Sequence, residues 1–153
     1  MPDKEPIERA RRDRRQGKAP STQAGDFVSE EIHHVREGKH GARSTKQVIA
    51  IGLSKARRAG VRLPPPKRAE AKASTRRAAA RDARKGRSVP KAKPSPARSR
   101  GNLKRLKGEP RRAASREALS RQARTAARGR SAAARSRAAK KAARTRARSK
   151  KRK

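Results

Sequence analysis

The sequence feature that most constrains the fold is one short aliphatic stretch, "STKQVIAIGLSKARRAGVRLPPP", which runs from Ser44 to Pro66. The rest of the chain is dominated by Arg, Lys, Ala, Ser and Pro, with one Phe and no Trp or Tyr. Apolar residues make up only 30% of the 153 residues, and many of them are Ala. Such a chain buries too little apolar surface to offset the entropy lost on ordering it. We therefore expect a mostly disordered protein with a small all-α element.

The aliphatic stretch predicts a helix over residues 44–60. The S-x-x-Q spacing that begins at Ser44 fits a capping box, which marks the start of a helix. Gly60 and the prolines after it predict the end of the helix. Gly52 lies within the apolar face, where a glycine costs about 1 kcal/mol against Ala. We therefore expect Gly52 to let another backbone approach closely.

A second amphipathic helix is predicted over residues 26–38. Asp26 suits the N-cap of this helix, and Gly38 suits the position that follows its C-cap. The short link to the next helix favours a helical hairpin within residues 26–63. A hairpin of this size is only marginally stable alone, so we expect it to self-associate or to bind a protein partner. The apolar face predicted for this contact consists of Phe27, Ile32, Val35, Val48, Ile49, Gly52 and Leu53.

Charge is distributed unevenly along the chain, which carries +37 in total. Residues 1–60 contain 14 Lys and Arg against 8 acids, a net charge of +6, whereas residues 61–153 contain 35 against 4, a net charge of +31. The composition predicts a mobile charged arm over residues 1–25. It also predicts a Pro-punctuated basic linker over residues 64–110 and an Arg/Ala-rich basic tail over residues 111–153.

A region this basic requires a polyanionic partner, and nucleic acid is the commonest one. Binding by counterion release is salt-sensitive and tolerant of sequence. Once phosphates neutralise its charges, the tail can become helical over about residues 111–128 and 131–147. The cations that we expect to contact nucleic acid are Arg98, Arg100, Lys104, Arg105, Arg111, Arg112, Arg116, Arg121, Arg124, Arg128, Arg130, Arg135, Arg137, Lys140, Lys141, Arg144, Arg146 and Arg148.

Duplex DNA is favoured over RNA because the chain lacks RGG repeats and the aromatic residues that stack on unpaired bases. An RNA- or ribosome-associated basic assembly factor is the alternative, because Arg-rich segments that fold on RNA have a similar composition. A third possibility is an adaptor that binds a protein partner and uses its tail as an anchor. The segment "KPSPARSR", Lys93 to Arg100, is similar to the Ser-Pro-basic units of linker-histone tails, which contact the minor groove. It also fits a plain Pro-rich linker.

Several functional classes are not expected. Without Cys the chain has no disulfide or thiolate metal site, and it has no apolar run long enough to span a membrane. The N-terminus lacks the apolar core of a secretory signal, so a cytoplasmic protein is expected. His33, His34 and His40 are interpreted as surface histidines rather than metal ligands, because Gly38 interrupts the helix between them. No catalytic constellation and no phosphate-binding loop is evident, so neither an enzyme nor a cofactor is expected.

The segment "KQVIAIGLSKARRAG", within Ser44–Gly60, resembles a small bacterial family often labelled as plasmid-stabilisation or DNA-binding proteins. Members of that family commonly carry Lys/Ala-rich tails. The resemblance is close over Ser44–Gly60 and looser over Glu30–Arg43, so it covers about a quarter of the chain. At Lys55 this chain has a base where the family often has an acid. The tail is also similar in composition to bacterial histone-H1-like proteins. The resemblance implies a nucleoid-associated, non-sequence-specific DNA-binding protein that is linked to plasmid or chromosome maintenance.

Overall fold

The computed structural model describes residues 4–88 and 95–150. This part of the chain contains seven α-helices, one short 3-10 helix and no strand, and most of its residues are helical. The prediction of a mostly disordered chain is therefore wrong. The chain divides into two compact units, residues 1–115 and residues 116–153, which we call the N-terminal unit and the C-terminal unit.

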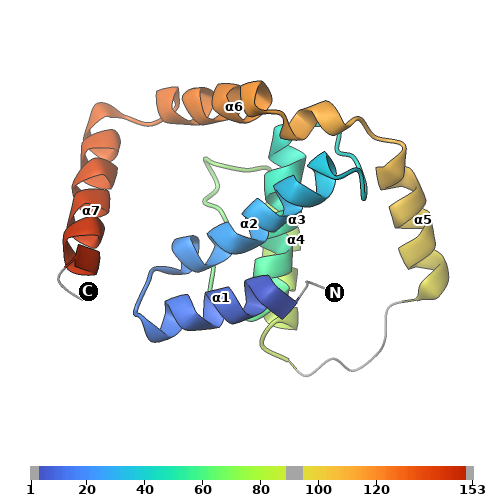
Figure 1. The fold of residues 1–153 in the computed structure, drawn as a ribbon, viewed down its shortest axis with the longest axis horizontal. Coiled ribbons are helices and arrows are strands. Elements are labelled where there is room, and N and C mark those ends of the chain that lie inside the picture. Colours follow the sequence, from blue (N-terminus) through green and yellow to red (C-terminus); the bar gives the residue numbers. More distant parts are fainter. Residues whose placement is uncertain (1–3, 89–94, 151–153) are drawn as a thin grey trace. The chain divides into compact units, whose positions relative to one another are not determined.

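The N-terminal unit is built around a stack of packed helices. Helix α1 packs on α2, α2 on α3, and α3 on α4, and the short helix η1 contacts both α2 and α3. Figure 1 shows α1 alongside α2, with α3 crossing behind them. The helices of this unit are α1 (Lys4–Arg15), α2 (Pro20–Arg36), α3 (Thr45–Arg58), α4 (Ala73–Lys85), α5 (Pro96–Lys107) and the 3-10 helix η1 (Arg111–Ala114).

Helix α2 begins at Pro20, well before the predicted start at Asp26. Proline is favoured at the first position of a helix because the missing N–H would have no helical partner there. Asp26 consequently lies inside α2, and its predicted role as N-cap is wrong. Within residues 1–25, predicted to be a mobile arm, the described part from Lys4 onward instead contains α1, a short turn and the beginning of α2.

The ends of α3 follow from its local sequence. The Ser44 side chain accepts a hydrogen bond from the Gln47 backbone N–H at 3.3 Å, as the spacing predicts. The Gln47 side chain in turn accepts from the Arg43 N–H at 3.1 Å, one residue before the expected position. Past the C-cap, Gly60 has φ +90°, a conformation that favours glycine. Helix α3 therefore begins and ends close to the predicted residues 44 and 60.

Two small apolar clusters form the core of the N-terminal unit. The first surrounds Phe27 between α1, α2 and α3, and the second lies between α2, α3 and η1. Alanine contributes much of both clusters, because its short side chain lets helices approach closely. The buried residues are Ala10, Ala24, Phe27, Ala56 and Val61 in the first cluster and Val35, Ala42, Val48, Ala113 and Ala114 in the second.

Disorder was predicted because much of the apolar content of the chain is Ala, which buries little surface. Ala24, Ala56 and Ala114 are fully buried, so each adds close packing between helices. Polar side chains also tie distant segments together. The Thr45 hydroxyl donates to the Ala113 carbonyl at 2.7 Å, and the Arg36 Nε donates to the Ala114 carbonyl at 2.8 Å. The start of the predicted tail is thereby anchored in the core.

The predicted basic linker, residues 64–110, contains two helices rather than an irregular segment. Helix α4 is fixed to α3 through the buried Asp82, which accepts hydrogen bonds from the Ser54 hydroxyl at 2.6 Å and from Arg58 Nε at 2.8 Å. In the segment similar to linker-histone tails, Lys93 and Pro94 lie outside the described residues. Ser95 is the N-cap of α5 and Pro96 begins the helix, so the part of that segment from Pro96 to Arg100 is helical.

The C-terminal unit consists of α6 (Arg116–Arg128) and α7 (Ala132–Lys150). Among its described side chains none is buried, so these helices have no core of their own. Their composition accounts for them, because Ala and Arg have the highest intrinsic helix propensities. The tail was predicted to become helical only on binding, whereas the structure already has helices close to the predicted residues 111–128 and 131–147.

Candidate nucleic-acid interface

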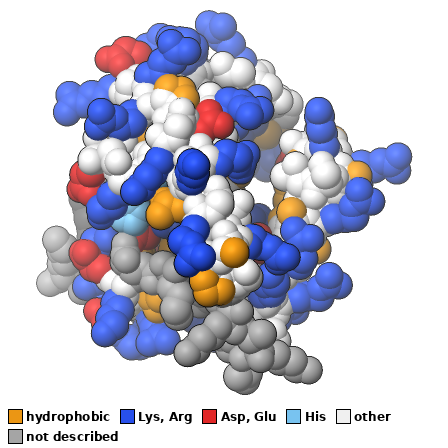
Figure 2. All heavy atoms as spheres, turned by 90° about the vertical axis from the view of Figure 1, so that its right-hand side faces the viewer, with side chains coloured by type: hydrophobic (Ala, Val, Ile, Leu, Met, Phe, Trp, Pro, Cys, Tyr) orange, Lys and Arg blue, Asp and Glu red, His pale blue; other side chains and the backbone are white. Residues whose placement is uncertain are grey.

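All eighteen cations predicted to contact nucleic acid are exposed. Six belong to the N-terminal unit, on α5 and η1, and twelve belong to the C-terminal unit. On the face shown in Figure 2, Lys and Arg side chains are widespread and acidic side chains are few. The cations on α5 and η1 are Arg98, Arg100, Lys104, Arg105, Arg111 and Arg112, and those of the C-terminal unit are Arg116, Arg121, Arg124, Arg128, Arg130, Arg135, Arg137, Lys140, Lys141, Arg144, Arg146 and Arg148.

Helix α7 carries its cations in two rows. At 100° per residue, one row occupies an arc of about 100°. Arg135 and Arg146 lie on the opposite side, about 180° away. No acidic residue occurs anywhere in α7. The helix therefore presents positive charge on two opposite sides, and its larger row consists of Arg137, Lys140, Lys141, Arg144 and Arg148.

Helix α6 has a different distribution. Arg121, Arg124 and Arg128 share an arc of about 60°, and Glu117 falls within the same arc. Leu119 lies on the other side, where the helix is apolar. Apart from Arg116 at its first residue, which lies about 110° from the centre of this arc, α6 is thus charged on one side, whereas α7 is charged on two.

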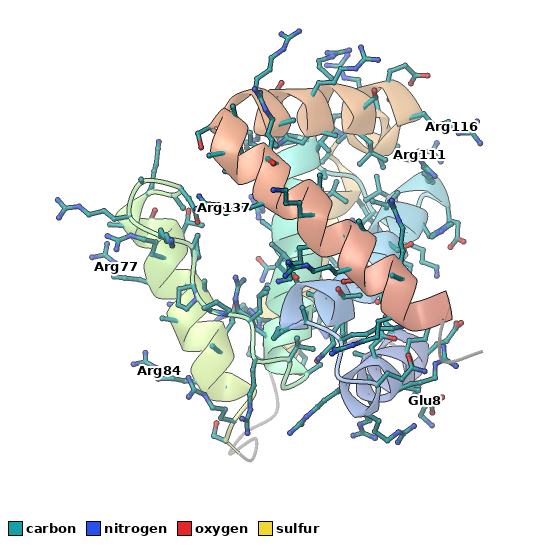
Figure 3. The ribbon with its side chains drawn as sticks, turned by 90° about the vertical axis from the view of Figure 1, so that its left-hand side faces the viewer. Glu8, Arg77, Arg84, Arg111, Arg116 and Arg137 are labelled. Carbon is teal, nitrogen blue, oxygen red and sulfur yellow. The ribbon has the colours of Figure 1, made fainter. Side chains whose placement is uncertain are left out.

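A further basic stripe on α4 was not predicted from the sequence. Arg77, Arg81 and Arg84 are exposed and recur at the i, i+4, i+7 spacing of one helix face. Figure 3 shows Arg77 and Arg84 on the outer side of α4. Asp82 packs toward α3, so the opposite side of α4 faces outward and carries the stripe. The sequence alone does not show which side of α4 packs on α3.

Two cations of α3, Lys55 and Arg57, hold the fold together and are not available to a ligand. Lys55 Nζ lies 2.6 Å from a carboxylate oxygen of the fully buried Glu31. Arg57 is buried and donates to the carbonyls of Leu63 and Pro64, at 3.3 and 3.2 Å. Burial lowers the pKa of the Arg57 guanidinium, since desolvation disfavours its charged form. Charge alone therefore does not identify an interface residue in this protein.

The predicted surface histidines differ from one another. His33 is exposed, whereas His40 Nε2 lies 2.9 Å from Glu31 and the His34 ring meets the His40 ring edge-on at 6.4 Å. Glu31, His34 and His40 could each offer one ligand atom within 4.8 Å of the others. The Lys55 ammonium already neutralises the Glu31 carboxylate, so the cluster is interpreted as a buried ion-pair network.

The face predicted for self-association or a partner lies largely inside the chain. Phe27, Val35 and Val48 are fully buried, and a Cβ on Gly52 would lie 2.7 Å from the Val28 Cα of α2. The close backbone approach expected at Gly52 therefore occurs between α3 and α2 of the same chain. The remaining members, Ile32, Ile49 and Leu53, are only partly buried.

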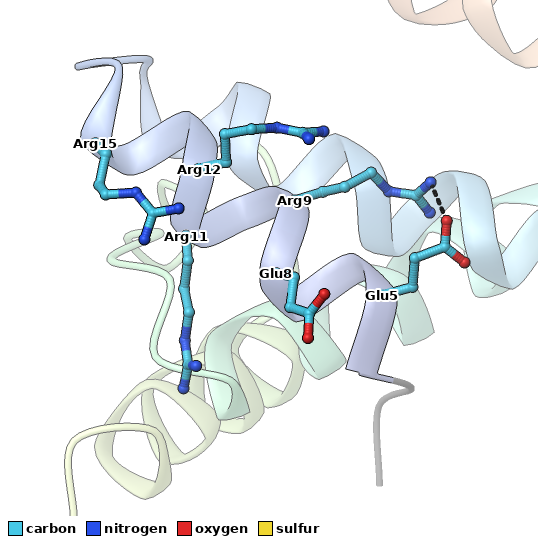
Figure 4. Close-up of a pocket in the computed structure, with 6 residues that line it drawn as sticks. All are labelled: Glu5, Glu8, Arg9, Arg11, Arg12 and Arg15. Carbon is cyan, nitrogen blue, oxygen red and sulfur yellow. Dashed lines mark hydrogen bonds and ion pairs between the residues drawn. The ribbon is translucent and has the colours of Figure 1, made fainter.

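On α1, acids and bases together surround a hollow of about 500 Å³. Figure 4 shows Glu5 and Glu8 among four arginines of this helix, with Glu5 bonded to Arg9 at 2.7 Å. The mixed charge makes this hollow a poor site for an anion.

Residues 4–68 match a family of unknown function (DUF6496). The match comprises α1, α2, α3 and the extended segment after α3, which is less than half of the chain. No curated protein and no solved structure matches the chain. The resemblance to plasmid-stabilisation and histone-H1-like proteins therefore stays a prediction. Among the helices in the described part of the chain, none is long and apolar enough to cross a bilayer.

Proposed function

We propose that this protein binds duplex DNA without sequence preference, as a cytoplasmic, nucleoid-associated protein. The observation that carries the proposal is the charge of the C-terminal unit. Residues 116–153 contain 16 Lys and Arg and a single acid, Glu117, a net charge of +15. The described cations of this unit are exposed. A surface of this kind attracts a polyanion by releasing its condensed counterions.

Helix α7 suits a duplex in its dimensions and in its arrangement of charge. Its 19 residues span about 28 Å, which is the length of about eight base pairs. The major groove admits an α-helix and has phosphates along both walls. Cations on two opposite sides of α7 can therefore reach both strands from within the groove. The small Ala and Ser residues between them allow the helix backbone to lie close to the DNA.

A duplex is favoured over a single strand because the chain offers no exposed Phe, Tyr or Trp ring. Proteins that bind single strands without sequence preference stack bases on aromatic side chains. The one Phe of the chain is Phe27, which is fully buried, and the sequence contains no Trp or Tyr. Double-stranded RNA has the same backbone charge, so an RNA- or ribosome-associated factor is the alternative that the experiment must distinguish.

The test is a salt titration of the full-length protein with a fluorescent duplex of mixed sequence. If the seven described cations of α7 each contact a phosphate, the slope of log K against log salt is about −6 from this helix alone. Scrambled duplexes should bind equally well. A slope shallower than about −3, or a strong preference for one sequence, would contradict the proposal.

A matched pair of triple variants locates the interface. The variant R137Q/K141Q/R144Q removes three cations from α7, and R77Q/R81Q/R84Q removes three from α4 at the same i, i+4, i+7 spacing. The α7 variant should make the slope shallower by about 2.7 and lower affinity about 10²-fold near 0.15 M salt. The α4 variant should have a much smaller effect. Equal losses would show that total charge, and not α7, determines binding.

The same titration with double-stranded RNA separates the two candidate polyanions. Tighter binding to RNA than to DNA, lost in the same α7 variant, would support the RNA-associated alternative. Comparable or tighter binding to DNA supports a nucleoid protein. Only then is a role in plasmid or chromosome maintenance worth testing, by measuring plasmid retention in cells that carry the α7 variant.

A further inference from the structure

A groove in the N-terminal unit combines an apolar floor with a cationic rim. The hollow measures about 770 Å³ and lies between α1, the segment after α3 and the end of α4. Ile7, Leu63 and Ala59 are partly buried along it, and fully buried Phe27 lies at its base. Three segments that are distant in the sequence therefore form one continuous surface.

The rim consists of four exposed arginines, and no acidic residue lines the groove. Among the described residues, none of the four pairs with a carboxylate. This separates them from Lys55 and Arg58, which hold the fold together through ion pairs. The groove therefore has positive charge that the protein itself does not neutralise. The rim residues are Arg11, Arg14, Arg62 and Arg87.

We propose that this groove docks an acidic amphipathic segment of a partner protein. Apolar side chains of the segment would contact the floor, and its Asp and Glu side chains would meet the rim. Nucleic acid would use the rim but not the floor, because Phe27 is fully buried and the groove offers no other aromatic ring for a base. The proposal does not depend on DNA binding by the C-terminal unit.

The occupant is neither a second copy nor another part of this chain. The chain has only 12 acids against 49 Lys and Arg, and no two acids are adjacent except Glu30 and Glu31. Those two lie on α2 and are buried. A second copy would therefore bring positive charge to a positive rim. The partner must be a different, acidic protein.

The wall of the groove also favours an amphipathic helix over an added strand. The segment after α3 is extended, but its prolines at 64, 65 and 66 have no N–H to donate. The Leu63 and Pro64 carbonyls already accept from Arg57. With few free backbone groups along this wall, recognition must come from side chains on both partners.

The probe is a designed peptide of about 14 residues, four helical turns, with Leu on one face and Glu on the other. Its control replaces each Leu with Ser at the same charge. Full-length protein labelled at Ile and Leu methyl groups is titrated with each peptide. The Leu peptide should shift the Ile7 and Leu63 methyl signals but not Leu103 or Leu119. Its affinity should exceed that of the Ser peptide by about tenfold or more, because the floor contributes only to the first.

The variant R14Q/R62Q/R87Q tests the rim, and R77Q/R81Q/R84Q is its control with the same loss of charge. The rim variant should lower the affinity for the Leu peptide by about tenfold or more, and the control variant should lower it by less than about threefold. Equal losses in the two variants, or equal binding of the two peptides, would overturn the proposal. A titration with a DNA duplex of about 20 base pairs gives a further test. The proposal would also be overturned if the duplex shifted the Ile7 and Leu63 methyl signals as strongly as the Leu peptide does and lost as much affinity in the rim variant. The groove would then be a nucleic-acid site.

Discussion

Helices α3 and α7 are both basic, but they use their cations in opposite ways. On α3, Lys55 and Arg58 each contact a buried carboxylate, and Arg57 is bonded to two carbonyls. On α7, eight Lys and Arg lie on a helix without a single acid. In the first case the cations stabilise a fold, and in the second they leave positive charge for a ligand.

Comparing the two units shows that the number of acids, not of cations, determines whether basic residues stabilise the fold or stay free for a ligand. The N-terminal unit has 11 acids against 33 Lys and Arg, and the C-terminal unit has one against 16. Carboxylates that are buried with a cation, such as Glu31 and Asp82, tie helices together where apolar residues are scarce. A unit with almost no carboxylates lacks these ties and depends on helix propensity alone.

The largest effect should come from Phe27→Ala, which attacks the N-terminal unit only. Phe27 is fully buried between α1, α2 and α3, so its truncation should cost about 3–5 kcal/mol. Single domains are typically stable by about 5–15 kcal/mol, so most of the unit's stability would be lost. Thermal melting followed by circular dichroism should show a cooperative transition at a much lower temperature, while the α6 and α7 signal persists.

The matched control for this change is Ala138→Gly in the middle of α7. This substitution should lower the local stability of α7 by about 1 kcal/mol and leave the cooperative transition of the N-terminal unit unchanged. If both variants shift one shared transition, the two units unfold together and the comparison between them fails.

Local sequence was enough to predict the helix ends that depend on neighbouring residues. Ser44 caps α3 and Gly60 ends it because both effects act within a few residues. What could not be predicted depends on distant contacts. Thr45 bonds to Ala113 across 68 residues, and Ser54 bonds to Asp82 across 28. No periodicity in the sequence indicates such pairs, which is why the tail and linker were expected to lack structure.

The next effect in size concerns two glycines in neighbouring helices. A Cβ on Gly52 would lie 2.7 Å from the Val28 Cα and 3.0 Å from the Phe27 carbonyl oxygen. Gly52→Ala should therefore destabilise the N-terminal unit by about 1–3 kcal/mol, because α2 and α3 must separate. Chemical denaturation followed by circular dichroism measures this change.

Gly25→Ala in α2 is the matched control, because a Cβ there meets no atom within 4 Å. It should stabilise the same unit by about 0.5–1 kcal/mol through helix propensity. Should Gly52→Ala prove stabilising as well, α2 and α3 are not in close contact.

The candidate site was predictable to the extent that it depends on composition. The rows of α7 follow from helical spacing once the helix is assumed, and all eighteen predicted cations are exposed. The α4 stripe and the groove rim were not predictable. The rim joins Arg11, Arg62 and Arg87 from three separate segments, and only the packing of α1 and α4 around α3 brings them together.

The smallest effect concerns Asp26, an acid of the N-terminal unit that departs from the pattern. Asp26 is partly buried and lies 3.8 Å from Arg9, a longer distance than the buried Asp13, Glu31 and Asp82 keep to their cationic partners. Burial, and then the nearby Asp13 carboxylate, raises the pKa of Asp26, and Arg9, Lys18 and Arg12 offset this only in part. The folded state therefore binds the Asp26 proton more tightly than the unfolded state does.

The raised pKa of Asp26 makes the stability of the N-terminal unit depend on pH. The free energy of unfolding should fall as pH rises from about 3.8 through the higher pKa of the folded state, because the ionised carboxylate is penalised by folding. Asp26→Asn removes the penalty, so it should raise the melting temperature slightly at pH 7, and the gain should disappear at pH values below the unfolded pKa.

Asp13→Asn is the informative comparison, since it removes a 2.6 Å ion pair with Lys18 and should lower the melting temperature. A lower melting temperature for Asp26→Asn at pH 7 would mean that its pairing with Arg9 outweighs the cost of burial. In that case Asp26 stabilises the fold through an ion pair, as Glu31 and Asp82 do.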